Sequence, residues 1–214
     1  MNDIKCIFFD LDGTLTDSAP GLAESFTYIF RKHGITHDGV DLRYFMGPPI
    51  MQTLKPYFST QEQLEAAVED FRSHYSKRLL TGNGLFPGIA EMLEALKANG
   101  YTLDVVTAKP QAVAETVVEH FGIRQYLNGV HGTHSGIIDK IHTLREALAD
   151  HNCPPTQAVM VGDRRFDLEA AQLGNTLAIG ALWGYGDLEE LEPYNRLFLA
   201  ATPADITKYF RKPI

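Results

Sequence analysis

Two carboxylates stand two residues apart where the first apolar run of the chain ends. Asp10 and Asp12, with Gly13 after them, follow residues 4–9, whose β-branched and aromatic side chains predict a buried strand. Because side chains alternate along a strand, Asp10 and Asp12 are expected to leave the same edge on roughly the same side. Two carboxylates that close repel each other unless a divalent cation holds both, and hard oxygen ligands suit Mg²⁺. The alternative is an ordinary strand-to-turn junction, which an isolated Asp-x-Asp-Gly would favour.

A second pair of carboxylates follows another short apolar run later in the chain. Residues 158–161 predict a buried strand, Asp163 comes just after it, and Asp167 follows one helical turn later. In a doubly wound sheet, the carboxyl ends of neighbouring strands form the ligand crevice. If the two strands are neighbours, Asp163 reaches the cation held by Asp10 and Asp12. Asp167 is expected to act behind Asp163 or through a water; the alternative is a first-turn acid favoured by the helix dipole.

Groups suited to an anion lie between these two pairs. Thr107 ends an apolar run and is followed by Ala108, Lys109 and Pro110. A Thr at the carboxyl end of a strand can donate its hydroxyl to a phosphate oxygen, and the next helix N-terminus adds amide donors. Lys140 begins a later predicted helix, where an isolated Lys is usually a solvated surface charge. These residues gain meaning from their order between the two acidic pairs.

The elements that must position these residues alternate along the chain, which predicts a mostly parallel sheet covered by helices. Strands are predicted near residues 4–9, 102–107, 129–131, 158–161, 176–179 and 197–199. Helices are predicted near residues 88–99, 111–121, 138–151, 166–173 and 204–210, with Gly100, Gly122 and Gly174 as C-caps.

Residues 16–80 differ, because no strand pattern is visible there. Pro20-Gly21 opens a helical pattern that Gly34 closes, and further helices are predicted over 50–58 and 61–79. A helical block between the first two strands of an α/β sheet indicates an inserted cap. The Gly-rich exit at 81–84 suits a hinge for a closing motion.

Together these segments resemble the haloacid dehalogenase (HAD) superfamily. Its first motif is similar to Asp10-Leu11-Asp12-Gly13-Thr14, its second to the segment around Thr107, and its fourth to Gly162-Asp163 and Asp167. The resemblance implies a Rossmann-like three-layer α/β core with a parallel sheet over 1–15 and 82–214. It also implies an inserted helical-bundle cap domain over 16–81, as in subfamily I.

The resemblance implies roles for individual residues. Asp10 is the expected nucleophile that forms an aspartyl-phosphate, and Asp12 is the expected acid–base. Asp10, Asp12 and Asp163 are the expected Mg²⁺ ligands, and Thr107 and Lys140 hold the phosphoryl oxygens. An Asp at position 12 is typical of HAD phosphatases and not of dehalogenases, phosphonatases or P-type ATPases.

Three other residues complete the expected site. Lys109 competes with Lys140 for the phosphate-pairing role. Ala108 replaces the Asn that is common in the second motif, so only its backbone is available to substrate. Arg43, before a Gly-Pro segment of the cap, is expected to hold a substrate carboxylate or second phosphate, with an exposed helix-end Arg as the equal alternative.

Several charged or polar residues are interpreted as structural. Arg164 is interpreted as a surface charge and Glu190 as part of a solvated helix face. His131 and His134 are interpreted as loop residues, because no Cys or third His completes a tetrahedral set. Cys6 and Cys153 lack metal or redox spacing and are expected to be buried or incidental thiols.

Composition limits the partners. A net charge of −8 over 214 residues argues against binding to nucleic acid, and no apolar run is long enough to span a bilayer. The N-terminus shows no signal pattern, so a cytoplasmic location and a monomer or homodimer are expected. The predicted function is a magnesium-dependent phosphatase of small phosphomonoester metabolites, similar to phosphoglycolate phosphatases. The alternatives are a β-phosphoglucomutase-type mutase and a non-catalytic HAD-like regulator that binds a phosphometabolite.

Overall fold

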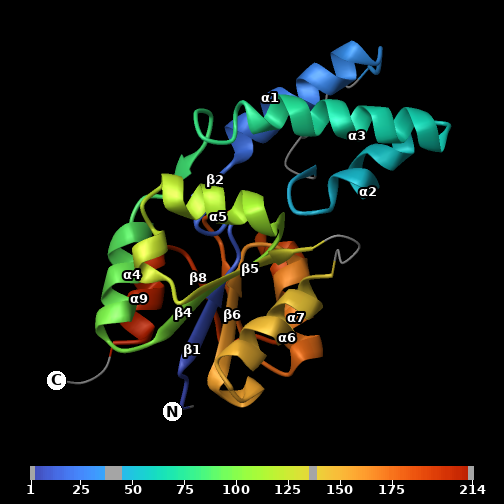
Figure 1. The fold of residues 1–214 in the computed structure, drawn as a ribbon. Helices are drawn as coiled ribbons and strands as arrows, with labels where there is room; N and C mark the ends of the chain where they lie inside the picture. The colour runs from blue at the N-terminus through green and yellow to red at the C-terminus, as the bar shows by residue number, and fades with distance from the viewer. Residues whose placement is uncertain (1–2, 37–44, 135–138, 212–214) are drawn as a thin grey trace. The chain divides into compact units, whose positions relative to one another are not determined.

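The computed structural model describes residues 3–36, 45–134 and 139–211. The chain divides into two compact units, one of residues 1–16 and 85–214 and the other of residues 17–84 (Figure 1). The first unit contains a large sheet with its helices, and the second is mainly helical. Each unit has its own buried apolar residues.

A six-stranded parallel sheet forms the centre of the first unit, in the order β5-β4-β1-β6-β7-β8. The strands are β1 (Cys6–Phe9), β4 (Thr102–Pro110), β5 (Gly129–Thr133), β6 (Ala158–Gly162), β7 (Leu177–Ala181) and β8 (Phe198–Ala200). The chain builds β4 and β5 on one side of β1 and then β6, β7 and β8 on the other. The order therefore reverses beside β1, where such sheets bind ligands.

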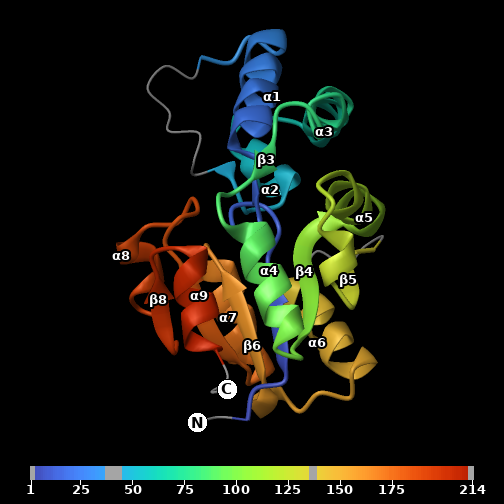
Figure 2. The ribbon, with the colours of Figure 1, turned by 90° about the vertical axis from the view of Figure 1, so that its left-hand side faces the viewer.

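Helices cover both faces of this sheet (Figures 1 and 2). Helices α4 (Ile89–Ala98) and α9 (Pro203–Tyr209) lie on one face, and α6 (Lys140–Asp150) and α7 (Arg165–Gly174) lie on the other. Helix α5 (Gln111–His120) packs against β4 and β5, and the short α8 (Leu188–Leu191) contacts α7. Single 3-10 turns span Arg124–Tyr126 and Pro155–Gln157. The predicted three-layer α/β fold is confirmed.

The central strands are apolar along their whole length because helices cover them on both sides. All four residues of β1 and all five of β6 are buried. Phe8 and Met160 pack under α6 and α7, together with Leu144 and Leu168. Continuous burial of this kind is typical of parallel sheets. It holds the carboxyl ends of β1 and β6 in fixed register, with Phe9 opposite Val161.

The second unit consists of α1 (Ala19–Lys32), α2 (Ile50–Leu54), a 3-10 turn (Lys55–Tyr57) and α3 (Gln61–Ser76). Helices α1 and α3 lie side by side (Figure 1). Aromatic rings join α1 to its neighbours: the ring centroids of Phe26 and Phe71 in α3 lie 4.8 Å apart, and those of Phe30 and Tyr57 in the 3-10 turn lie 5.0 Å apart. The buried face of α1 includes Phe26, Ile29 and Phe30.

Three expectations about local structure are wrong. Thr16–Asp17 forms a two-residue strand, β2, which pairs with β3 (Gly84–Leu85). Two residues are too few to produce a visible period in the sequence. The C-cap of α7 is Asn175, in the left-handed region at φ 57°, and Gly174 is the last helical residue. His131 lies in β5 and is buried, not in a loop, whereas His134 is exposed beyond that strand.

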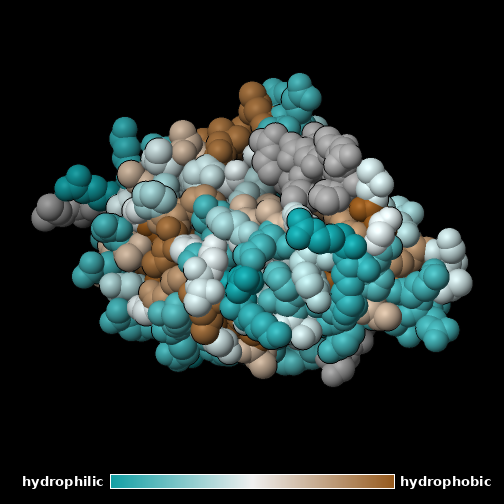
Figure 3. All heavy atoms as spheres, turned by 90° about the horizontal axis from the view of Figure 1, so that it is seen from above, coloured by the Kyte–Doolittle hydropathy of each residue, from teal (hydrophilic) through white to brown (hydrophobic). Residues whose placement is uncertain are grey.

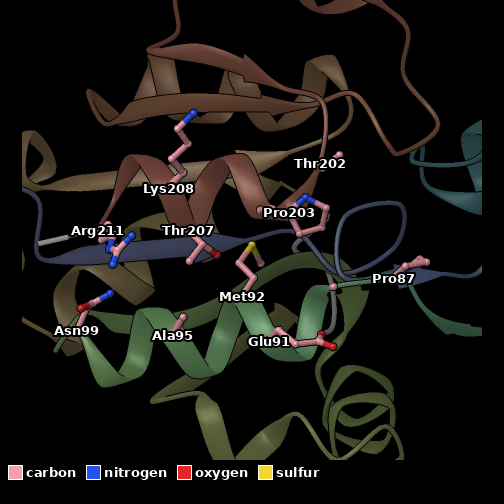
Figure 4. A pocket seen from close by; sticks show the side chains of 12 residues that line it. Pro87, Glu91, Met92, Ala95, Asn99, Thr202, Pro203, Thr207, Lys208 and Arg211 are labelled. Atoms are coloured by element: carbon pink, nitrogen blue, oxygen red, sulfur yellow. The ribbon is translucent and has the colours of Figure 1, made fainter.

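The outer surface gives few indications of function. The face in Figure 3 is mainly hydrophilic, and its hydrophobic residues lie in small groups, as on most globular proteins. An open groove of about 830 Å³ lies between α4 and α9 (Figure 4), and none of its 12 lining residues is a predicted site residue. Within the described ranges, every helix is too short or too polar to cross a bilayer.

Candidate active site

Two predicted site residues meet at the carboxyl edge of the sheet because their strands are neighbours. Asp10 follows β1 and Asp163 follows β6, and these strands pair in parallel. The backbone N–H of Asp10 donates to the carbonyl of Val161 at 2.9 Å, which extends the pairing to the first carboxylate. The structure thus brings together residues 153 positions apart in the sequence, at the reversal of strand order.

A third carboxylate joins them. Oxygen atoms of Asp10, Asp163 and Asp167 lie within 4.8 Å of one another, and all three residues are buried. Burial and the nearby Asp167 and Asp10 raise the pKa of Asp163 to about 8. Burial also raises the pKa of Asp10 to about 6, although Lys140 opposes this shift. Without a further cation, the group is therefore short of positive charge.

Lys140 is the cation that this group contains. Its Nζ lies 2.8 Å from Asp10 Oδ1 and also contacts Asp167 Oδ1. Burial disfavours the charged ammonium, but attraction to Asp10 and Asp167 outweighs it and raises the pKa of Lys140. Asp139 places the residue by capping α6, since its carboxylate accepts the N–H of Ile141 at 3.1 Å. Asp167 is held in turn by the backbone N–H of Arg164 at 3.0 Å.

The carboxylate of Asp12 pairs with a different lysine. Its Oδ2 lies 2.8 Å from Lys109 Nζ, and its side chain is absent from the group around Asp163. Strand β1 ends at Phe9, before either carboxylate of the first motif. Beyond it the chain turns at Gly13, where φ is +92°. Lys140 and Lys109 therefore contact different carboxylates of the first motif.

Thr107 and Ala108 lie in β4, one strand away from Asp10. The hydroxyl oxygen of Thr107 accepts the N–H of Lys109 at 3.2 Å, so its own hydrogen is left for another acceptor. Thr107 is buried, and the carbonyl of Ala108 accepts from Thr133 at 3.3 Å. Arg43, the remaining predicted substrate contact, lies outside the described residues.

Glycines allow the backbone to enclose Asp163 closely. A Cβ at Gly13 would lie 2.3 Å from Asp163 Oδ2, and one at Gly184 would lie 2.3 Å from Asp163 Cβ. The two oxygens of Asp163 accept from the Thr14 hydroxyl at 2.9 Å and from the Tyr185 N–H at 2.8 Å. Each oxygen keeps a second acceptor position. The loop after β7 thus positions this carboxylate through Gly184 and the N–H of Tyr185.

The donor set fits a hard divalent cation. Three buried carboxylates face a single lysine, which leaves a net charge of about −2 when all are ionised. Oxygen donors of this kind are the ligands that Mg²⁺ takes in proteins, usually one or two carboxylates with waters and phosphate completing the shell. Asp10 and Asp163, from two neighbouring strands, are the donors best placed for it. Asp167 is already held by Lys140 and Arg164.

Two charges interpreted as surface residues form an internal ion pair instead. Arg164 is buried, and its Nε lies 2.9 Å from Glu190 Oε1. The same oxygen accepts the N–H of Arg165 at 2.9 Å. The pair joins the start of α7 to α8 directly behind Asp163 and Asp167. Nothing local in the sequence signals it, because the partners are 26 residues apart.

Comparison with known proteins identifies the family of the chain. Residues 7–181 match the family model of the haloacid dehalogenase-like hydrolases. The chain is similar to a tyrosine-protein kinase PtkA of Mycobacterium tuberculosis, 36% identical over 85% of this chain, but it spans only 63% of that protein. It is 33% identical to a 5′-nucleotidase of Pseudomonas aeruginosa, covering 88% of this chain and 87% of the relative. It is 31% identical to a phosphoglycolate phosphatase of Vibrio vulnificus, covering 95% of both.

Solved structures show the same fold. A haloacid dehalogenase-like family hydrolase from Streptococcus pneumoniae superposes with a TM-score of 0.93 at 32% identity. The match covers 99% of this chain and 100% of that one. The arrangement of sheet and helices is therefore shared over almost the whole length of the two chains.

Proposed function

Because the chain belongs to the haloacid dehalogenase-like hydrolase family, we propose that it is a magnesium-dependent phosphatase of small phosphomonoesters. One observation carries the proposal. Asp10 is buried beside Lys140, and its carboxylate lies close to those of Asp163 and Asp167 at the sheet edge. A carboxylate in that position has an anion-binding lysine on one side and donors for a cation on the other.

Asp10 is proposed as the nucleophile. One of its oxygens attacks phosphorus, the P–O bond to the leaving group breaks, and an aspartyl-phosphate forms. Lys140, 2.8 Å from Asp10 Oδ1, holds the carboxylate in place and offers its charge to a phosphoryl oxygen. Thr107 donates its free hydroxyl hydrogen to another phosphoryl oxygen. These contacts favour positioning and charge stabilisation, which dominate phosphoryl transfer.

Asp12 is proposed as the acid–base. It gives a proton to the leaving oxygen, and then takes one from the water that attacks the aspartyl-phosphate. The proton count closes, because the proton lost in the first step is regained in the second. Lys109, 2.8 Å from Asp12 Oδ2, is proposed to orient this carboxylate rather than to bind phosphate. The two lysines would then have separate roles.

Mg²⁺ would be held by Asp10 and Asp163, with Asp12 contributing as the sequence suggested and Asp167 supporting Lys140. When bound, it supplies positive charge that lets an anionic phosphate approach an anionic carboxylate. The three carboxylates of the buried group support this assignment. We also propose that residues 16–81 act as a cap that chooses the substrate, with Arg43 as a substrate contact. We further propose that the protein is cytoplasmic and is a monomer or a homodimer.

Phosphate release from p-nitrophenyl phosphate tests the proposal. Wild-type protein should release phosphate in the presence of Mg²⁺ and lose this activity in EDTA. The Asp10→Asn variant should release no phosphate under either condition. Asp3→Asn is the matched control, because that carboxylate is 76% exposed and paired only loosely with Lys5. Full activity of Asp10→Asn would refute the nucleophile. A panel of phosphoglycolate, nucleoside monophosphates and sugar phosphates would then identify the substrate.

Phosphate transfer to a protein tyrosine is the second candidate, because a relative at 36% identity is named a tyrosine-protein kinase. The phosphatase is preferred because the phosphatase relative matches over 95% of its length and the kinase over 63%. Incubation with radiolabelled ATP and a tyrosine peptide separates the two, since a kinase labels the peptide. To test the mutase alternative, the protein is incubated with a hexose 1-phosphate and a bisphosphate primer. Formation of the hexose 6-phosphate would identify a mutase. Binding without turnover over the whole panel would favour a regulator.

A further inference from the structure

Three side chains of types that can bind metals meet on the sheet, apart from the proposed catalytic group. Asp104 lies in β4, His131 in β5, and His151 caps the C-terminal end of α6. The Nε2 atoms of His131 and His151 lie 2.9 and 2.6 Å from the same oxygen, Asp104 Oδ2. One ligand atom from each residue lies within 4.8 Å of the others.

This cluster is enclosed by the fold. The side chains of Asp104 and His131 are 0% and 9% exposed, and that of His151 is 22% exposed. The pairing of β4 with β5 places Asp104 opposite Gly129. A Cβ at Gly129 would lie 2.8 Å from both Asp104 Oδ2 and His131 Nε2. The absence of a side chain there leaves the room that the three ligands occupy.

Hydrogen bonding within the cluster is unbalanced. Asp104 Oδ2 serves both imidazoles, whereas the buried Asp104 Oδ1 has no partner among the described residues. A buried carboxylate oxygen without a hydrogen-bond partner costs free energy, and few such atoms occur in native proteins. Coordination of a cation by Asp104 would give Oδ1 the partner that it lacks.

The chemistry of the donors selects the kind of cation. Two imidazole nitrogens and one carboxylate oxygen suit Zn²⁺ and related first-row ions rather than Mg²⁺. The Nδ1 of His131 lies 3.9 Å from Asp150 Oδ2, so a carboxylate is near the ring atom that would not bind the metal. Around tetrahedral Zn²⁺, ligand atoms lie about 3.3 Å apart. Each imidazole nitrogen therefore needs to move away from Asp104 Oδ2 by less than ~1 Å.

We propose that Asp104, His131 and His151 form a Zn²⁺ site with three protein ligands and a fourth position open to water. It is separate from the proposed Mg²⁺ group, because Asp104 precedes Thr107 by three residues, or about 10 Å along β4. The ion would tie β4, β5 and the end of α6 together. It would stabilise the folded protein, since the ligands come together only in that state.

Zinc retention tests this proposal independently of phosphatase activity. Wild-type protein is stripped with EDTA, incubated with Zn²⁺ in excess Mg²⁺, dialysed, and its metal content measured. His151→Gln removes one ligand that is partly exposed. His142→Gln is the matched control, because it lies on the same helix and is 48% exposed. Thermal unfolding of each protein is recorded with and without Zn²⁺.

Wild-type protein and His142→Gln should each retain one Zn²⁺ and show a higher Tm with zinc. His151→Gln should lose both the retained ion and the Tm shift. Failure of wild-type protein to retain zinc, or equal retention by His151→Gln, overturns the proposal. If His151→Gln does not fold, X-ray absorption of zinc-loaded wild-type protein decides. Scattering from two imidazoles is expected, and a spectrum without imidazole refutes the site.

Discussion

Replacing Lys140 by Met should destabilise the metal-free protein strongly at alkaline pH. The substitution keeps most of the side-chain volume but removes the ammonium that contacts Asp10 and Asp167. The side chains of Lys140, Asp10 and Asp167 are 11%, 9% and 0% exposed, so water replaces little of the lost contact. Breaking a buried ion pair by removing one partner costs about 3–5 kcal/mol. For a chain of this size, that lowers Tm by about 6–20 °C.

The loss should depend on pH, and its sign follows from the carboxylates. Burial raises the pKa of Asp10 to about 6 even though Lys140 lowers it, so removal of Lys140 raises that pKa further. At pH 5 the folded variant can neutralise Asp10 by binding a proton, whereas at pH 8 it must keep an unpaired buried charge or take up a proton at greater cost. The free-energy loss is therefore larger at pH 8 than at pH 5.

Urea unfolding in EDTA at both pH values measures this loss. Lys109→Met is the control, because it breaks an ion pair of the same length, 2.8 Å, whose carboxylate, Asp12, is 22% exposed and can regain water. Its loss should be smaller than that of Lys140→Met. The reasoning is refuted if Lys140→Met stays within about 1 kcal/mol of wild type at pH 8. It is also refuted if the loss is greater at pH 5.

Three further outcomes are expected. Burial raises the pKa of Asp163 to about 8, so the metal-free protein should lose stability as pH rises from about 4 to 8. Calorimetry in EDTA measures Tm over this range, and a Tm that rises with pH throughout would contradict the expectation. Gly184→Ala should cost about 1–3 kcal/mol and weaken Mg²⁺ binding in titration calorimetry, because its Cβ meets Asp163 at 2.3 Å. Gly84→Ala meets nothing within 4 Å, and equal effects of the two would contradict the reasoning. Glu190→Gln should cost about 1.5–3 kcal/mol in urea unfolding by weakening its pair with buried Arg164, and an unchanged midpoint would contradict it.

The sequence predicted the elements whose residues show a strong period or sit at motif boundaries. The buried strands before Asp10 and Asp163 were visible as apolar runs, and their adjacency followed from the doubly wound pattern. The boundaries differ by one to three residues. Strand β4 runs on to Pro110, because its pairing with β5 resumes there after a shift in register. A local pattern does not contain such pairing information.

Contacts between distant residues were not predictable in the same way. The pairing of Asp12 with Lys109 joins two motifs that are far apart in the sequence, and no local pattern signals it. Lys109 and Lys140 were both identified from the sequence as candidates for one role. The structure pairs Lys109 with Asp12 and Lys140 with Asp10. The pairing of Arg164 with Glu190 has no short-range signature. The buried group that contains His131 was missed for the same reason, since its members come from two strands and a helix end.

A crystal structure with Mg²⁺ and trifluoroberyllate, which mimics an aspartyl-phosphate, tests the central claim most directly. We expect beryllium bonded to an oxygen of Asp10, with Lys140 beside the fluorides and a metal ion in contact with Asp163. Trifluoroberyllate bound elsewhere, or a metal ion away from Asp163, would contradict it.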